Sequence, residues 1–195
     1  MNLHSEMTGA ADAAARTVAN VDPSQFGRPT PCTEWDVRAL LNHLILWTSH
    51  SLEARARGES VGQELIDRDF ADDPGFAAAY RAQLDRALTA WANPAVWELS
   101  LNVMGSPTPA ADVAALNIAE MVLHGWDLAV ATGQTYTVSE PAAVAAMRAA
   151  EANADLFRQY KGFADPVEVP PAASVLDQLL ALSGRDPGWT PATKG

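Results

Sequence analysis

The amino-acid sequence predicts an all-α fold in which several helices form a bundle. Long stretches carry apolar residues at helical spacing, and Gly and Pro residues mark where these stretches begin and end. No series of alternating strands lies between them, so the helices must bury their apolar faces against one another. The length of 195 residues and the hydrophobic content of 48% suit one domain that spans residues 1–195.

Local signals predict six helices in chain order. Gly133 and Pro141 are typical of a helix C-terminus and of a first helical turn, respectively. The segment Trp97–Met104 is expected to form a short extended piece. The helices are Ser5–Val21, Glu34 to about Arg57, the segment from Gly75 to Pro94, Ala110–Thr132, Glu140–Tyr160 and Ser174–Ser183.

The start of the second helix is predicted from its capping residues. Thr33 is a good N-cap, and Glu34 and Asp36 then lie in the first turn, where negative charge suits the helix dipole. Cys32 before the cap and Val37 inside the helix fit a hydrophobic staple. We therefore expect Cys32 to be an apolar contact rather than a nucleophile.

The charge and cysteine content exclude several classes of function. A net charge of −11 argues against nucleic acid and anionic membranes as partners, because both require clusters of Lys and Arg. The single cysteine, Cys32, rules out a disulfide framework and a cysteine-based zinc site within one chain. No leader segment and no membrane-spanning run are expected, so a cytoplasmic protein is the default. The expected partners are a small-molecule substrate and, as an open alternative, a second copy of the chain.

Two polar residues inside the most apolar helix are the main functional signal. Glu120 and His124 are four residues apart, so their side chains share one face of the helix. Charged groups are seldom buried unless they are paired or bind a metal ion. Asp127 follows on the same stripe, where it is either an acceptor that orients His124, the alternative we favour, or a solvated surface acid.

A third donor comes from the second helix. His43 lies on an apolar face there, and two packed helices could bring it against Glu120 and His124. Two imidazoles and one carboxylate form a ligand set for Zn²⁺ or another first-row divalent ion, with open positions for water or substrate. His50 is on the same face but about 10.5 Å further along the axis, so it should not reach this point.

The spacing also permits an ordinary structural interpretation. Glu120 and His124 could form a simple ion pair, and His43 could be a core histidine bonded to a carbonyl group. The pattern is not the His-Glu-x-x-His of metalloproteases, so a protease is not indicated. Trp35, Trp47 and Trp126 are expected to be core residues rather than a substrate platform.

Three segments resemble a known family. PTPCTEWDVRALLNHL resembles the second-helix signature of the DinB-like superfamily, in the branch of the mycothiol-dependent maleylpyruvate isomerase N-terminal domain. AEMVLHGWDLAVATGQ resembles the helix that carries the remaining ligands in that branch. The tail from Gly162 to Trp189 is similar to the ending of an actinobacterial subgroup of metal-binding proteins.

The resemblance implies a fold and a site. The fold is a DinB-like four-helix bundle with a long crossover, to which this chain adds C-terminal helices. The site holds one divalent metal ion, zinc or nickel, and its ligands fall on His43, Glu120 and His124. Asp127 takes no ligand position in the motif.

The resemblance also suggests an activity. Characterised relatives use a low-molecular-weight thiol, such as mycothiol, as a co-substrate. The leading expectation is therefore a metal-dependent transferase that adds such a thiol to an electrophilic small molecule. A metal-dependent hydrolase and a non-catalytic metal-binding protein are the alternatives. The isomerase has a further C-terminal α/β domain, whereas here only about 60 residues follow the fourth long helix, so isomerase activity is not expected.

Overall fold

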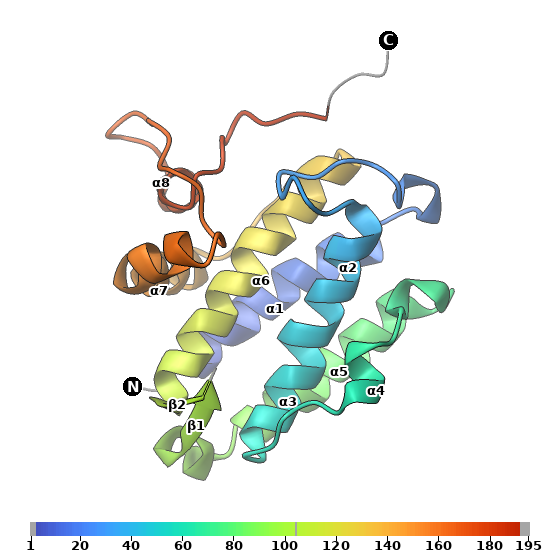
Figure 1. The fold of residues 1–195 in the computed structure, drawn as a ribbon, viewed down its shortest axis with the longest axis vertical. Helices are drawn as coiled ribbons and strands as arrows, with labels where there is room; N and C mark the ends of the chain where they lie inside the picture. The colour runs from blue at the N-terminus through green and yellow to red at the C-terminus, as the bar shows by residue number, and fades with distance from the viewer. Residues whose placement is uncertain (1–2, 104, 192–195) are drawn as a thin grey trace.

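The computed structural model describes residues 3–103 and 105–191, and it is mostly helical with one small β-hairpin (Figure 1). The α-helices are α1 (His4–Ala19), α2 (Val37–Ile45), α3 (Ser51–Ala56), α4 (Gln63–Ile66), α5 (Phe76–Trp91), α6 (Ala110–Thr132), α7 (Glu140–Gln159) and α8 (Val175–Leu182). The strands β1 (Ser100–Val103) and β2 (Ser106–Pro109) are antiparallel, with Ser100 opposite Pro109. The all-α prediction therefore holds in outline, and the hairpin is an addition to it.

Helix α6 is the central element of the core. It packs against α1, α2 and α7, while α5 packs against α1 and α3, and α8 covers α7 (Figure 1). By length and composition α6 could cross a membrane, but 78% of its most apolar window is buried inside the protein. Its apolar character is thus accounted for by contacts with the other helices, as in the core helix of a globular protein.

Several predicted elements are confirmed. Helix α6 has the predicted bounds, and Gly133 ends it with a φ of 77°, the left-handed conformation typical of a C-cap glycine. Helix α7 begins at Glu140 as predicted, and Ser174 caps α8 by accepting a hydrogen bond from the Asp177 amide. The extended piece is partly right, because β1 occupies its middle, Trp97 lies in a short helical turn, and Met104 is outside the described residues.

The predicted start of the second helix was wrong. The helix begins at Val37, and Asp36, not Thr33, is the N-cap, since its carboxylate accepts from the Ala39 amide at 2.8 Å. Asp36 also pairs with Pro29 in an isolated β-bridge, which keeps the preceding residues out of a helical conformation. The staple of Cys32 with Val37 was wrong for the same reason, because Cys32 lies in this loop.

The second helix is also interrupted. The segment Leu46–His50 forms a π-helical turn between α2 and α3. The hydroxyl groups of Thr48 and Ser49 each donate to the carbonyl group four residues earlier, at 2.6 Å. Such bonds compete with the helical ladder and distort it.

His50 is the last residue of this π-turn. The prediction placed His50 on the face of His43, but its ring stacks on Phe70, with the ring centres 5.1 Å apart. His50 lies outside the group of His43, Glu120 and His124, as its distance along the helix axis predicted.

Candidate metal centre

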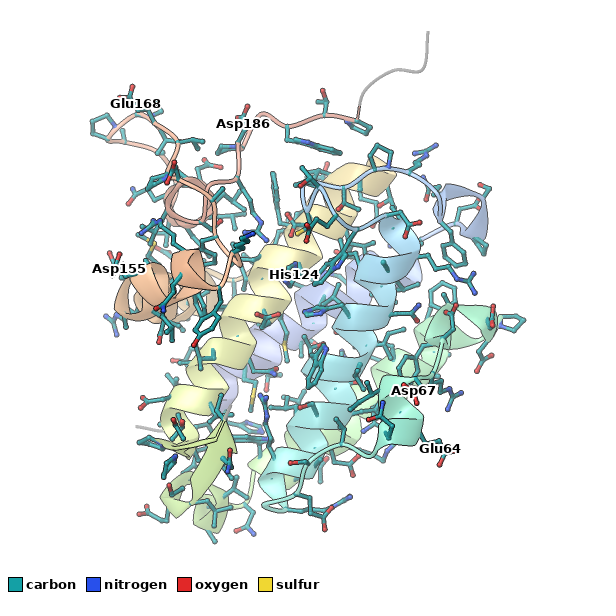
Figure 2. The ribbon with its side chains drawn as sticks, in the orientation of Figure 1. Glu64, Asp67, His124, Asp155, Glu168 and Asp186 are labelled. Carbon is teal, nitrogen blue, oxygen red and sulfur yellow. The ribbon has the colours of Figure 1, made fainter. Side chains whose placement is uncertain are left out.

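Helices α2 and α6 bring three potential ligands together. His43 projects from α2, and Glu120 and His124 project from α6; Figure 2 shows His124 between the two helices. The Nε2 atom of His43 is 2.9 Å from Oε2 of Glu120, and the Nε2 atom of His124 is 3.4 Å from the same oxygen. All three donor atoms lie within 4.8 Å of one another.

These distances can be compared with those around a metal ion. Zinc bonds of about 2.0–2.1 Å in tetrahedral geometry place neighbouring donor atoms roughly 3.3 Å apart. The separation of 3.4 Å between His124 and Glu120 matches this value, and the 2.9 Å between His43 and Glu120 is a hydrogen bond that would open by a few tenths of an ångström. Two of the three separations are therefore close to those around a divalent ion, and the third, between the two imidazoles, is no more than 4.8 Å.

The cluster lies at the boundary between core and solvent. The side chain of Glu120 is 40% exposed, while those of His43 and His124 are 21% and 13% exposed. The carboxylate is thus the accessible side of the cluster, and the two imidazoles form its floor. An open side next to the ligands is what distinguishes a reactive metal site from a closed structural one.

A buried carboxylate orients His124 from behind. Oδ2 of Asp127 accepts a hydrogen bond from Nδ1 of His124 at 2.9 Å, and the Asp127 side chain is fully buried. When His124 is neutral, a proton held on Nδ1 would leave the lone pair of Nε2 directed at His43 and Glu120. This is the contact with His124 that the sequence suggested for Asp127.

Arg185 completes this arrangement and was missed in the sequence. Its guanidinium donates from Nε to Oδ1 and from Nη2 to Oδ2 of Asp127, both at 2.8 Å, and it is 8% exposed. Gly184 immediately before it has a φ of 82° and lies against the backbone of Ala164. The segment that follows α8 therefore packs back against α6. Arg185 lies 58 residues from Asp127 in the sequence.

A second group of donors shares His124. Cys32, His124 and Asp127 also lie within 4.8 Å of one another. In this group, however, both oxygens of Asp127 already accept from Arg185, whose Nη2 is also 3.6 Å from the Cys32 sulfur. The guanidinium thus supplies the positive charge there, so the group with Glu120 is the better candidate for a metal ion.

The charges in the cluster support one another. Burial raises the pKa of Glu120. The positive charge of His124 and the hydrogen bond from His43 outweigh the effect of burial and lower this pKa to about 2. Burial lowers the pKa of His124, but Glu120 and Asp127 outweigh it and raise that pKa to about 10. Burial likewise raises the pKa of Asp127, yet Arg185 and His124 hold it well below its usual range. In the protein without metal, both ring nitrogens of His124 are therefore protonated at neutral pH, and the imidazole is positively charged.

The loop before α2 adds two residues whose positions differ from expectation. Trp35 is half-buried rather than fully in the core, and its ring lies against both imidazoles, 4.5 Å from that of His43 and 5.6 Å from that of His124. The thiol of Cys32 donates to Oδ2 of Asp127 at 3.2 Å. No periodic pattern marks either contact, because both residues lie in an irregular loop.

The chain is similar to a known protein family over most of its length. The model of the mycothiol maleylpyruvate isomerase N-terminal domain matches residues 7–129, which include all three candidate ligands and Asp127. The chain belongs to this family. Arg185 lies beyond the matched residues, so it is a feature of the segment that follows the family domain.

Relatives of similar length exist in a mycobacterium. The uncharacterized proteins MT0763 and Rv0738, from two strains of Mycobacterium tuberculosis, are each 32% identical to the chain over 191 residues. The alignments cover 90% of this chain and 93% of each relative. No solved structure matches the chain. These relatives extend the similarity past the family domain and into the C-terminal segment.

Proposed function

We propose that this protein is a metal-dependent transferase that adds a low-molecular-weight thiol, of the mycothiol type, to an electrophilic small molecule. The observation that carries the proposal is the cluster of His43, Glu120 and His124, which presents three donor atoms and an exposed side. Membership of a mycothiol-associated family supports the choice of thiol. We further propose zinc or nickel as the ion, a DinB-like four-helix arrangement around it, and the cytoplasm as the compartment.

Each residue at the candidate metal centre would have a defined role. His43, Glu120 and His124 would hold the ion, which supplies a Lewis acid that lowers the pKa of a coordinated thiol. Once His124 has lost its second proton, Asp127 would keep the remaining one on Nδ1, so that Nε2 could bind the ion. Trp35 covers one side of both imidazoles and excludes water from that side. The exposed side, next to Glu120, is left for the thiol and the electrophile.

Cobalt substitution tests this proposal. Protein loaded with Co²⁺ is titrated with mycothiol, and ligation by sulfur should add an absorption band in the near ultraviolet. Because the thiol must lose its proton on binding, the change should grow as the pH rises towards the pKa of the free thiol. A thioether derivative of mycothiol, which has no proton to lose, is the control and should give a much weaker change.

The same experiment separates the two other classes of function. Turnover of an ester or amide without any thiol, together with a cobalt spectrum that mycothiol leaves unchanged, would replace the transferase with a hydrolase. A cobalt protein that responds to neither compound would be a metal-binding protein without this chemistry.

A further inference from the structure

Two hydrogen bonds join α6 to the second helix in the part of the chain that the structure describes. One is the bond between His43 and Glu120 at the candidate metal centre. The other runs from Nδ2 of Asn117 on α6 to the carbonyl oxygen of Trp47, at 3.0 Å. Trp47 follows His43 by four residues. Asn117 precedes Glu120 by three residues, so the second bond lies about one helical turn from a ligand on both helices.

Asn117 is a buried polar residue in an apolar stretch of α6. Residues 113–116 and 118–119 around it are apolar, and Asn117 itself is 2% exposed. Its Oδ1 atom is buried and accepts no hydrogen bond from any described residue. The amide cannot be turned round to correct this, because Oδ1 would then meet the Trp47 carbonyl oxygen, which is also an acceptor. A buried acceptor without a donor lowers stability, so its presence needs an explanation.

The carbonyl group that Asn117 binds belongs to the π-turn. In this turn the N–H of Ser51 donates to the carbonyl group of Leu46, five residues earlier instead of four. Where a helix returns from bonds over five residues to bonds over four, one carbonyl group is passed over and needs another donor. Asn117 supplies a donor to Trp47, whose carbonyl group comes directly after that of Leu46. The amide thus connects the irregular part of the second helix to α6.

A bond of this kind can fix how two helices align. Helices α2 and α6 pack side by side through mainly apolar contacts (Figure 1). A single buried Asn between packed helices can set their register, at a cost in stability. Metal binding must open the bond between His43 and Glu120. Among the described residues, the bond of Asn117 is then the direct hydrogen bond that remains between the two helices.

We propose that Asn117 is a positioning residue for the metal centre. Its bond to Trp47 fixes the register of α6 against the second helix, and thereby the separation of His43 from the two ligands on α6. Metal sites need their ligands within about 0.5 Å of the productive geometry, whereas apolar packing tolerates larger shifts. The inference rests on the metal centre of the proposed function. It explains why the chain keeps a polar group that an apolar side chain would replace at little cost in stability.

The test compares stability with metal binding in two variants. Asn117→Leu removes the bond to Trp47 and the unpartnered Oδ1 together, and these two effects on stability oppose each other. In the metal-free form its midpoint of thermal unfolding should lie within about 4 °C of the wild type. Its affinity for Co²⁺ should fall about tenfold, and the visible absorption bands of the bound ion should change because the ligands shift. Asn117→Ala, which introduces no bulk, should show the same loss of affinity.

Tyr80→Phe is the matched control. The buried phenol of Tyr80 is hydrogen-bonded to the hydroxyl group of Thr48 in the same π-turn, at 2.7 Å, but it comes from α5. Its removal weakens the turn and leaves the bond to α6 in place. The affinity for Co²⁺ and the spectrum of the bound ion should therefore stay those of the wild type.

Three results would overturn the role of Asn117. The first is Asn117 variants that bind Co²⁺ as tightly as the wild type, with the same spectrum. The second is an equal loss of affinity in Tyr80→Phe, because the turn itself and not its bond to α6 would then matter. The third is a loss of affinity in Asn117→Leu that comes only with a much lower midpoint of unfolding, as a merely structural role requires.

The titration contains no thiol, so these results leave the proposed transferase intact as long as the wild type binds Co²⁺. A wild-type protein that binds no Co²⁺ would refute the metal centre and the role of Asn117 together.

Discussion

At the scale of single residues, Asp127 connects the family domain with the C-terminal segment. One of its oxygens accepts from His124 and from Arg185, and the other accepts from Arg185. The position of His124 therefore depends on Asp127, which is not itself one of the three candidate ligands. Partners of this kind typically change metal affinity by a factor of 10–100 when they are mutated.

Asp127→Asn should lower the affinity for Zn²⁺ roughly 10–100-fold while the protein remains folded. The amide can no longer carry the charge that balances Arg185 and fixes the proton on His124. Affinity is measured by competition with a chromophoric chelator. Asp112→Asn, at an exposed position in the first turn of α6, is the control and should bind Zn²⁺ like the wild type. Equal affinity in both variants would show that Asp127 has no influence on the metal.

Some of these residues carry a signal in the sequence, and others do not. Glu120 and His124 are found from their spacing, because a helix places residues four apart on one face. His43 needed the assumption that α2 packs against α6, which the structure bears out. Arg185 has no such signal, since it follows α8 in an irregular segment and meets Asp127 only through the tertiary fold.

At the scale of elements, the C-terminal segment is held by a glycine, Gly184, at which any side chain would be strained. A Cβ atom on Gly184 would lie 2.6–2.9 Å from Ala164, and the φ of 82° disfavours any side chain. The conformation of Gly184 brings the next residue, Arg185, to Asp127. The attachment of this segment therefore depends on local backbone geometry as well as on the ion pair.

Gly184→Ala should destabilise the protein by roughly 1–3 kcal/mol and weaken metal binding along with it. The physical cause is the clash with Ala164, which forces Arg185 away from Asp127. Thermal unfolding and zinc affinity are measured on the same samples. Gly27→Ala is the control, because a Cβ there meets nothing within 4 Å. A Gly184→Ala protein as stable as the control would contradict the assigned role.

The elements themselves were predictable to different degrees. Helix α6 has a strong apolar pattern and a C-cap glycine, so both of its ends were predicted correctly. The second helix offers two competing caps, Thr33 and Asp36, and the pairing with Pro29 that decides between them is not visible in the sequence. The π-turn depends on hydroxyl bonds of Thr48 and Ser49 that a spacing argument does not include.

At the scale of the whole molecule, metal binding and protonation compete for the same residue. The pKa of His124 is raised to about 10 in the protein without metal, above its ordinary value of 6.5. The ion needs the lone pair of Nε2, so binding must release a proton at any pH below this value. Metal occupancy should therefore depend strongly on pH.

The affinity for Zn²⁺ should rise about tenfold for each pH unit between roughly pH 6 and pH 9. The direction of this pH dependence follows from His124, because its second proton must leave before the ion binds and leaves more easily as the pH rises. Proton release is measured by calorimetry in buffers of different ionisation enthalpy. An affinity that stays constant from pH 7 to pH 9, with no proton released, would mean that His124 is already neutral in the protein without metal.

The most direct test of the whole account is the metal content of three purified proteins, the wild type, His43→Ala and Cys32→Ala. We expect about one divalent ion per chain in the wild type and in Cys32→Ala. In His43→Ala the ion should be largely lost, because removal of one of three ligands costs several kcal/mol out of a total of about 10–16 kcal/mol. Metal retained in His43→Ala but lost in Cys32→Ala would place the ion between Cys32, His124 and Asp127 instead. A wild-type protein without metal, after growth in metal-replete medium, would contradict the metal centre itself.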